Sequence, residues 1–274
     1  MKCFYHKSDL DGHCAGAIVK QFHPGCEMIG VDYNDVPPVP PEIGHNEVVF
    51  VVDFSFPVDT MLMLHDVGHL VWVDHHKSAI EKMEGHEDIP GIRAVGKSGC
   101  ELTWECLYSD EPMPDAVRLL GRYDVWDHRN PDVLPFQYGL RHEHDTSPEN
   151  TLLWGLLLAD SPGVVYRVTK TGQTILKYQV AQDAMYAKGM AYEAELEGLR
   201  AIVINKAYTN SKIFDAVYDP EKHDIMVVFG VKPGEFKYSL YSDKPEHDVS
   251  KIAVKFGGGG HAGAAGFYSE TQVV

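Results

Sequence analysis

The segment Leu70-Val71-Trp72-Val73-Asp74-His75-His76 is an apolar strand that runs directly into one carboxylate and two imidazoles. Two other predicted strands end in the same way. The strand from Cys3 to Tyr5 runs into His6-Lys7-Ser8-Asp9-Leu10-Asp11, and the strand from Val48 to Val52 runs into Asp53. Because ligand sites of open parallel sheets lie outside the carboxyl ends of the strands, we expect these acids and imidazoles to converge on one point.

The donors in these segments are imidazole nitrogens and carboxylate oxygens, with no sulfur among them. This set suits Mn²⁺ or Mg²⁺ better than a structural zinc, and the imidazoles favour Mn²⁺. Two such ions that share a carboxylate would lie about 3.5–4 Å apart, a spacing that serves phosphoryl displacement. Asp124, within Gly121–Asp127, can add another carboxylate, although Asp124 and Asp127 are also compatible with simple turn caps.

Strands and helical patterns alternate over the first 165 residues, which is typical of a mostly parallel sheet. The clearest helix follows the capping box Ser98-Gly99-Cys100-Glu101. Another should begin at Ser147-Pro148-Glu149, where a capping serine precedes a proline in the first helical position. The predicted helices cover Ala15 to Gln21, Gly99 to Tyr108, Asp115 to Arg122 and Thr151 to Ala159.

A long helical pattern that includes Ile175, Tyr178, Met185 and Tyr192 connects this part to a second, strand-rich part. We therefore predict an α/β protein with two lobes. A parallel-sheet domain covers residues 1–165, a helical linker covers 166–195 and a smaller α/β domain covers 196–274. The proline-rich run 36–41 is predicted to be a stiff loop. The elements predicted in the second domain are strands Ala201 to Asn205, Ile213 to Tyr218, Ile225 to Val231 and Phe236 to Tyr241, then a helix from Val249 to Phe256.

Composition limits the class of protein. The 274 residues contain 24 Lys and Arg against 40 Asp and Glu, a net charge of −16, which is the wrong sign for tracking long duplex nucleic acid. Such a surplus of carboxylates is compatible with acids gathered around divalent cations. No apolar run approaches the roughly 20 residues that span a bilayer, and the N-terminus lacks a signal-peptide core, so we expect a cytoplasmic protein. The five cysteines form no C-x-x-C pair and are predicted to be reduced and mostly buried.

The motifs together resemble the DHH phosphoesterase family. The resemblance rests on His6-x-x-Asp9-x-Asp11, Asp53, Asp74-His75-His76 and Asp124 within Arg-Tyr-Asp-Val-Trp. The second domain resembles the DHH-associated C-terminal domain through Asp248-Val249-Ser250 and the run from Phe256 to Gly266. Within the family the chain is most similar to the nanoRNase branch, which hydrolyses very short oligonucleotides.

The resemblance implies a two-metal active site that faces the cleft between the lobes. One ion would bind His6, Asp9 and Asp53, and the other would bind Asp11, Asp53, His75 and Asp124, so that Asp53 is the bridge. Asp74 would orient a histidine through its second ring nitrogen, and His76 would face the phosphate; we assign catalytic roles to both. Two residues separate His6 from Asp9, where the family more often has three.

In the second domain, the run Gly257 to Gly260 is compatible with a helix C-cap, but four glycines followed by His261 favour a phosphate-binding nest of backbone amides. We expect the small residues after His261 to start a helix. By resemblance, Gly258, Gly259, Gly260 and His261 should hold the far end of a nucleotide. Tyr241 is a further candidate contact, because it stands where many relatives have an arginine and cannot supply that charge.

The expected function is a Mn²⁺-dependent phosphodiesterase that converts linear dinucleotides such as pGpG, and other short oligonucleotides, to 5′-mononucleotides. Alternatives are hydrolysis of pyrophosphate, polyphosphate or cyclic mononucleotides, a non-catalytic nucleotide sensor, and an acidic interaction module that binds no metal tightly. Neither a membrane nor a long duplex is an expected partner. A homodimer is compatible with the sequence.

Overall fold

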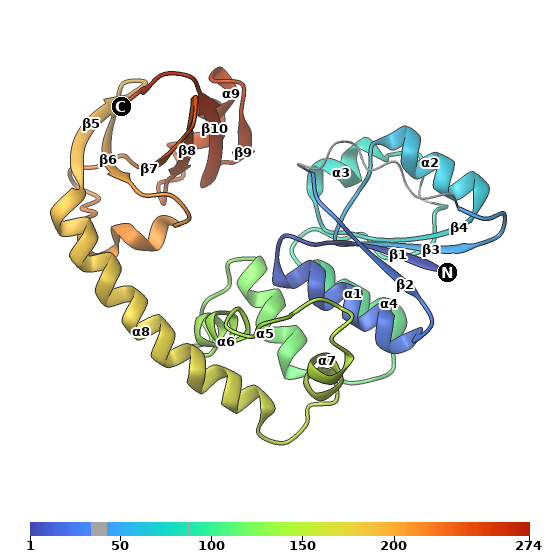
Figure 1. Cartoon of the computed structure of the whole chain (residues 1–274). Coiled ribbons are helices and arrows are strands. Elements are labelled where there is room, and N and C mark those ends of the chain that lie inside the picture. Colours follow the sequence, from blue (N-terminus) through green and yellow to red (C-terminus); the bar gives the residue numbers. More distant parts are fainter. Residues whose placement is uncertain (34–42, 87) are drawn as a thin grey trace. The chain divides into compact units, whose positions relative to one another are not determined.

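The computed structural model describes residues 1–33, 43–86 and 88–274, which form two compact units, Met1–Leu176 and Lys177–Val274 (Figure 1). The proline-rich run 36–41, predicted to be a stiff loop, lies outside the described residues.

A four-stranded parallel sheet forms the centre of the first unit, which confirms the predicted α/β class. Its order is β2-β1-β3-β4, so the chain leaves β1 towards one edge and later returns to the other side of β1. This reversal makes the carboxyl ends of β1 and β3 a topological switch point, where α/β sheets bind ligands. The strands are β1 (Lys2–His6), β2 (Glu27–Val31), β3 (Val48–Val52) and β4 (His69–Val73).

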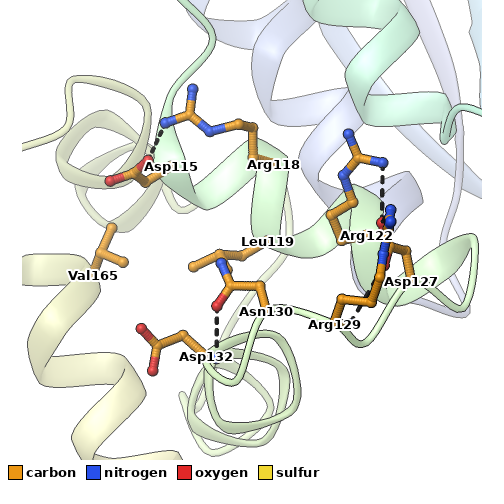
Figure 2. A pocket seen from close by; sticks show the side chains of 9 residues that line it. All are labelled: Asp115, Arg118, Leu119, Arg122, Asp127, Arg129, Asn130, Asp132 and Val165. Atoms are coloured by element: carbon orange, nitrogen blue, oxygen red, sulfur yellow. Dashed lines mark hydrogen bonds and ion pairs between the residues drawn. The ribbon is translucent and has the colours of Figure 1, made fainter.

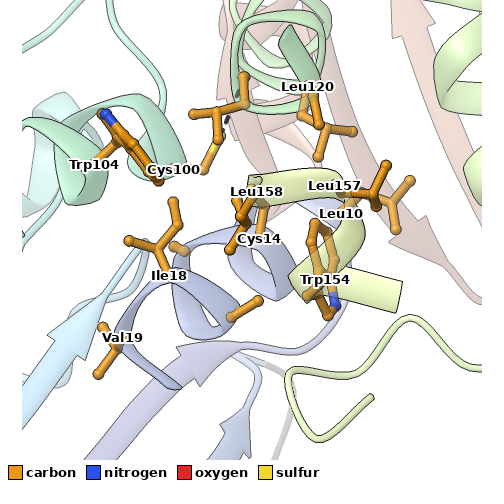
Figure 3. Close-up of a cluster of buried hydrophobic side chains, with 14 of the residues drawn as sticks. Leu10, Cys14, Ile18, Val19, Cys100, Trp104, Leu120, Trp154, Leu157 and Leu158 are labelled. Atoms are coloured by element: carbon orange, nitrogen blue, oxygen red, sulfur yellow. Dashed lines mark hydrogen bonds between the residues drawn. The ribbon is translucent and has the colours of Figure 1, made fainter. Parts of the chain in front are cut away.

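Helices cover both faces of this sheet (Figure 1). Alternate residues of β3 divide between two cores: Val49 and Val51 pack with helices α2 (Val58–Val67) and α3 (Lys77–Lys82), whereas Phe50 and Val52 pack with the helices of the other face. The second core is the larger, and Figure 3 shows Leu10, Ile18, Trp104 and Trp154 among its members. Its helices include α1 (Leu10–Phe22), α4 (Gly99–Leu107), α5 (Asp115–Asp124), α6 (Val133–Leu140) and α7 (Thr151–Leu158).

The predicted start of α7 was wrong. The capping residue is Asn150, whose side chain accepts a hydrogen bond from the Leu153 amide at 3.2 Å, and not Ser147. The Ser147 carbonyl instead accepts a hydrogen bond from the Asn150 amide, which closes a separate turn before the helix. The capping box at Ser98 is confirmed, with both of its hydrogen bonds present.

Helix α8 (Val164–Met190) runs from the first unit into the second. It ends before Tyr192, which lies in a strand, so the predicted extension of the helical pattern to Tyr192 was wrong. Within the first unit, α8 packs very closely on α6: a Cβ at Gly172 would lie 1.7 Å from the Pro135 carbonyl oxygen, and one at Gly139 would lie 2.0 Å from the Val168 carbonyl oxygen.

We expect Gly172→Ala to destabilise the protein by about 3 kcal/mol, because the new methyl group has no space and must separate the two helices. Gly189→Ala is the matched control in the same helix, since a Cβ there meets nothing within 4 Å. That change should stabilise the protein by up to about 1 kcal/mol. Thermal or urea unfolding measures both, and equal effects of the two variants would contradict the close packing of α6 and α8.

The second unit contains a mixed six-stranded sheet of order β5-β6-β7-β8-β10-β9, in which β6 and β7 are parallel and the other neighbours are antiparallel. Helix α9 (Val249–Lys255) contributes Val249, Ile252 and Ala253 to its core. The strands are β5 (Tyr192–Leu196), β6 (Leu199–Asn205), β7 (Ile225–Lys232), β8 (Glu235–Tyr241), β9 (Gly259–His261) and β10 (Ala264–Ser269).

Two predictions for this unit were wrong. The segment predicted as a strand from Ile213 to Tyr218 is a 3-10 helix, Ser211–Ala216, in which the adjacent side chains of Ile213 and Phe214 are both buried. Adjacent burial fits a helical turn and not the alternation of a half-buried strand. The residues after His261 form β10 and not a helix; β10 pairs with β9 in a hairpin.

Most of the cysteines are buried, as predicted. The side chains of Trp72, Trp104 and Trp154 also lie in the core. All five cysteines lie among the described residues, where they are free thiols, and Cys106 alone of the five is partly exposed. Among the helices formed by the described residues, none is both long enough and apolar enough to cross a membrane.

Candidate metal centre

Six of the predicted ligands meet at the carboxyl end of the parallel sheet, in three groups whose donor atoms lie within 4.8 Å of one another. Each group combines residues from at least two segments that are far apart in the sequence. The groups are His6, Asp9 and Asp53; Asp11, His75 and Asp124; and Asp53, His75 and His76.

The first group joins the end of β1 to the start of α1. His6 Nδ1 lies 2.9 Å from Asp9 Oδ2 and 3.7 Å from Asp53 Oδ2. Asp9 is also the N-cap of α1, because its Oδ1 accepts the Gly12 amide at 2.9 Å. The cap fixes the Asp9 carboxylate against the helix and leaves Oδ2 turned towards the imidazole.

The second group is held by the N-terminus of α4. The carboxylate of Asp11 is buried and accepts two amides of that helix, Gly99 at 2.7 Å and Cys100 at 3.1 Å. Helix N-termini favour negative charge, which explains how a buried carboxylate is tolerated there. His75 Nε2 lies 3.4 Å from Asp124 Oδ2, at the end of α5, and 3.3 Å from Asp53 Oδ1.

Asp53 belongs to two of the three groups and is 1% exposed. It follows β3 in the left-handed backbone region, with φ of 53°, where a non-glycine residue is uncommon and is found at functional sites among other places. Its Oδ1 and the Nδ1 of His6 are buried, and within the described residues no group meets either atom with hydrogen-bond geometry. A divalent cation would satisfy both atoms, so the donor set fits a metal.

Asp74 supports the neighbouring histidine. It is fully buried and accepts His76 Nδ1 at 2.7 Å, the His75 amide at 2.7 Å, the His76 amide at 3.1 Å and the Ser55 hydroxyl at 2.5 Å. These bonds fix the ring of His76 and leave its Nε2 for a ligand or a proton.

The protein environment raises the pKa values of three groups of the centre, Asp124, Asp53 and His6. Burial, and then the charge of Asp11, raise the pKa of Asp124 to about 8 and raise the pKa of Asp53 well above its usual range. Burial opposes the charged form of His6, but Asp53 and Asp9 outweigh it and raise the His6 pKa to about 10. The metal-free centre therefore holds protons at neutral pH, which a cation must displace.

We expect the metal-free protein to lose stability as the pH rises from 5 to 8. In this window folded Asp124 binds a proton that the unfolded chain has released, and above pH 6.5 folded His6 does the same, so the free energy of unfolding falls as pH increases. The fall should be at least about 1 kcal/mol, because one pKa unit corresponds to about 1.4 kcal/mol. Thermal unfolding across this pH range in EDTA measures the effect. Saturating Mn²⁺ should reverse the slope; an unchanged slope with Mn²⁺ would contradict a metal at this centre.

The residues of the second unit that were predicted to contact substrate lie in or beside its β-sheet. Gly259, Gly260 and His261 form β9. A Cβ at Gly258 would lie 2.1 Å from the Gly266 carbonyl oxygen and one at Gly260 would lie 2.5 Å from the Ala265 Cα, so close packing on β10 accounts for these two glycines, whereas a Cβ at Gly259 would meet nothing within 4 Å. His261 is exposed, whereas Tyr241 is half-buried beside the core of that unit. Phosphate binding by these residues stays a prediction.

Three features of the centre were missed from the sequence. Ser55 donates its hydroxyl to Asp74, the amides of Gly99 and Cys100 hold Asp11, and the ring of Tyr33 lies 5.7 Å from that of His6. The capping box at Ser98 signalled a helix N-terminus, which attracts carboxylates, but nothing in the sequence paired it with Asp11.

The chain was compared first with known protein families and sequences. No protein-family model matches the chain. An uncharacterized protein of Acanthamoeba polyphaga mimivirus is 28% identical over 232 residues, 81% of this chain and 53% of that protein. The chain thus spans about half the length of the curated relative that it matches.

Three solved structures are similar over nearly the whole chain. The pGpG-specific phosphodiesterase PggH from Vibrio cholerae has a TM-score of 0.58 at 14% identity, covering 97% of this chain and 92% of that one. The DHH domain of a member of a ribosomal protein family has a TM-score of 0.59 at 14% identity, covering 98% and 82%. An exopolyphosphatase-related protein from Bacteroides fragilis has a TM-score of 0.51 at 13% identity, covering 99% and 87%.

The chain therefore has the fold of the DHH-domain proteins, and the resemblance inferred from its motifs is confirmed at the level of the fold. At these identities the likeness concerns the fold alone.

Proposed function

We propose that the chain is a member of the DHH phosphoesterases and acts as a divalent-metal-dependent phosphodiesterase. Its substrates are short oligonucleotides, linear dinucleotides such as pGpG among them, and its products are 5′-mononucleotides. Two ions, Mn²⁺ or Mg²⁺, would be held there, one by His6, Asp9 and Asp53 and the other by Asp11, Asp53, His75 and Asp124. The similarity of fold to a pGpG-specific phosphodiesterase supports the choice of substrate.

One observation carries the proposal: Asp53 Oδ1 and His6 Nδ1 are buried where the ligand groups meet, and although polar atoms lie near both, none of the described residues meets either atom with hydrogen-bond geometry. An unsatisfied buried carboxylate oxygen is costly, and a structural role would have supplied it with a donor. The same residue has a strained backbone and follows the carboxyl end of β3, which is where α/β sheets bind ligands.

The residues of the centre divide the chemistry between them. Divalent ions held by His6, Asp9, Asp11, Asp53, His75 and Asp124 supply the positive charge that a phosphodiester requires and lower the pKa of attacking water. Asp74 fixes the ring of His76 through Nδ1. His76 Nε2 is then free to donate a proton to the departing oxygen.

The electrostatics suit His76 for this role. Burial opposes its charged form, but the hydrogen bond and charge of Asp74 outweigh that effect and raise the His76 pKa. A raised pKa increases the fraction of His76 that is protonated near neutral pH, and a general acid must be protonated to act. Asp74 itself stays ionised, because its bonds to His76 and Ser55 hold its pKa below the usual value despite burial.

A turnover assay in Mn²⁺ tests the proposal. The panel contains pGpG, a longer oligoribonucleotide, cyclic AMP and polyphosphate at equal concentration. The wild type should cleave the dinucleotide fastest, and a variant with Asp74→Ala and His75→Ala together should be inactive. His76→Ala should keep its metal content, measured by elemental analysis, and lose most of its turnover.

Each other outcome of the assay would favour one of the alternative functions. Consumption of polyphosphate or of cyclic AMP alone would keep the metal centre and reject the oligonucleotide substrate. Stoichiometric nucleotide binding with no turnover would favour a sensor. Failure to bind any divalent ion would reject the centre and leave an acidic interaction module.

A further inference from the structure

Trp126 occupies an unusual backbone position at the end of α5. The Trp126 amide donates to the Tyr123 carbonyl at 3.1 Å, and the Asp127 amide donates to the Arg122 carbonyl at 2.8 Å. These two bonds define a Schellman motif, in which the residue at the position of Trp126 is left-handed and is usually glycine. Its φ is 59°, a left-handed conformation that is unfavourable for a residue with a bulky side chain.

Packing does not explain the tryptophan. The side chains of Trp72, Trp104 and Trp154 are 5% exposed or less, whereas Trp126 is 60% exposed. A strained residue that gains little from burial is a candidate for a functional role, because strain is retained where function requires it.

Two arginines form ion pairs with Asp127 in the turn around Trp126. Asp127 accepts both Nε and Nη2 of Arg129 at 2.7 Å and Nη1 of Arg122 at 3.3 Å, as Figure 2 shows. The same turn begins at Asp124, a member of the second ligand group. The exposed indole is therefore anchored two residues beyond a candidate metal ligand.

The indole also ends a row of aromatic rings. Tyr123 and His128 stack with centroids 5.6 Å apart, and His128 lies 5.3 Å from Trp126. Trp126 is the most exposed of the three rings, so a flat ring of a ligand has access to its indole and can stack on it. The neighbouring pocket of about 570 Å³ in Figure 2 is a weaker candidate, because its three arginines face three aspartates and leave little net charge for an anion.

We propose that Trp126 stacks on an unpaired base of the oligonucleotide whose phosphodiester lies at the metal centre. This inference rests on the proposed function and adds a determinant of substrate class. Stacking on a π-face tolerates every base, so it selects single-stranded nucleotides over polyphosphate and over paired strands without reading sequence. Trp126 is a binding residue here and takes no part in proton transfer.

Kinetics with a dinucleotide and with its abasic analogue test the inference. Trp126→Ala should raise KM for the dinucleotide about 10-fold with little change in kcat, and Trp126→Phe, which keeps a ring, should restore most of the loss. The KM for the abasic analogue should be the same in all three proteins. Tyr166→Ala is the matched control, since it removes an aromatic side chain of similar exposure, 66%, from α8.

Two further measurements separate binding from folding. Trp126→Gly places glycine where the backbone prefers it, so its unfolding temperature should equal or exceed that of the wild type while its KM matches that of Trp126→Ala. In Ca²⁺, the dinucleotide should quench the emission of the exposed tryptophan, and the quenching should be absent in Trp126→Phe.

An unchanged KM in Trp126→Ala, or an equal loss with the abasic analogue, would overturn the inference while dinucleotide turnover by the wild type still supported the proposed function. If the wild type turned over no dinucleotide, the proposed function would fail, and the quenching experiment would decide whether Trp126 binds a base at all.

Discussion

Asp53→Asn should lower turnover of the preferred phosphodiester by about 1000-fold or more and should remove tight binding of divalent cations. The carboxylate of Asp53 is shared by two ligand groups, so its loss weakens both. An amide keeps the shape but not the charge that holds a cation, and charge stabilisation at such centres is worth several kcal/mol. Turnover assays and metal titration by calorimetry measure the two effects.

The same substitution should leave the metal-free protein as stable as the wild type or more stable. Burial and the nearby charge of Asp11 already disfavour the ionised form of Asp53 and raise its pKa. Removing this charge relieves repulsion, so only the increase in unfolding temperature caused by Mn²⁺ should disappear. Asp115→Asn, on the exposed surface of α5, is the control and should retain turnover and metal binding. A fully loaded Asp53→Asn protein would show that the shared carboxylate is not a ligand.

Gly99→Ala should lower turnover at least about 100-fold although Gly99 has no side chain of its own. A Cβ at this position would lie 2.5 Å from both Cβ and Oδ1 of Asp53, and the Gly99 amide is the donor that holds Asp11. Because Asp53 is buried and already strained, it must shift, and a displacement near 1 Å at a reacting centre can cost about 100-fold.

Gly155→Ala in α7 is the matched control for this prediction, because a Cβ there meets nothing within 4 Å. That variant should be stabilised by up to about 1 kcal/mol and should turn over substrate at the wild-type rate. Comparable activity of the two alanine variants would mean that Asp53 need not occupy the position seen in the structure.

The strands of the first unit could be predicted because three short apolar runs each end in acids or imidazoles, a pattern that a parallel sheet brings to one edge. Strand β2 was missed because Glu27-Met28-Ile29-Gly30-Val31 contains a charge and a glycine and lies at the edge of the sheet. The choice of Asn150 over Ser147 as a cap depends on where the preceding turn closes, which local propensity does not determine.

Convergence of His6, Asp53 and His75 was predictable from the strand ends alone, whereas the supports of the centre were not. The bond from Ser55 to Asp74 and the amides that hold Asp11 join segments far apart in the sequence. In the second unit the glycine run predicts a phosphate-binding nest, and the structure adds that Gly258 and Gly260 lie too close to β10 to carry a Cβ. A glycine indicates that another group approaches the backbone closely, but it does not show whether that group is a bound anion or a neighbouring strand.

The donors of the centre come from β1, α1 and the ends of β3, β4 and α5, so they span the chain from His6 to Asp124. No short segment holds enough of them to chelate an ion before the sheet has assembled. Contacts of such long sequence separation form late on a folding pathway. A divalent cation should therefore leave the rate of folding almost unchanged and slow the rate of unfolding. Bound metal would make the native state longer-lived without helping the chain to reach it.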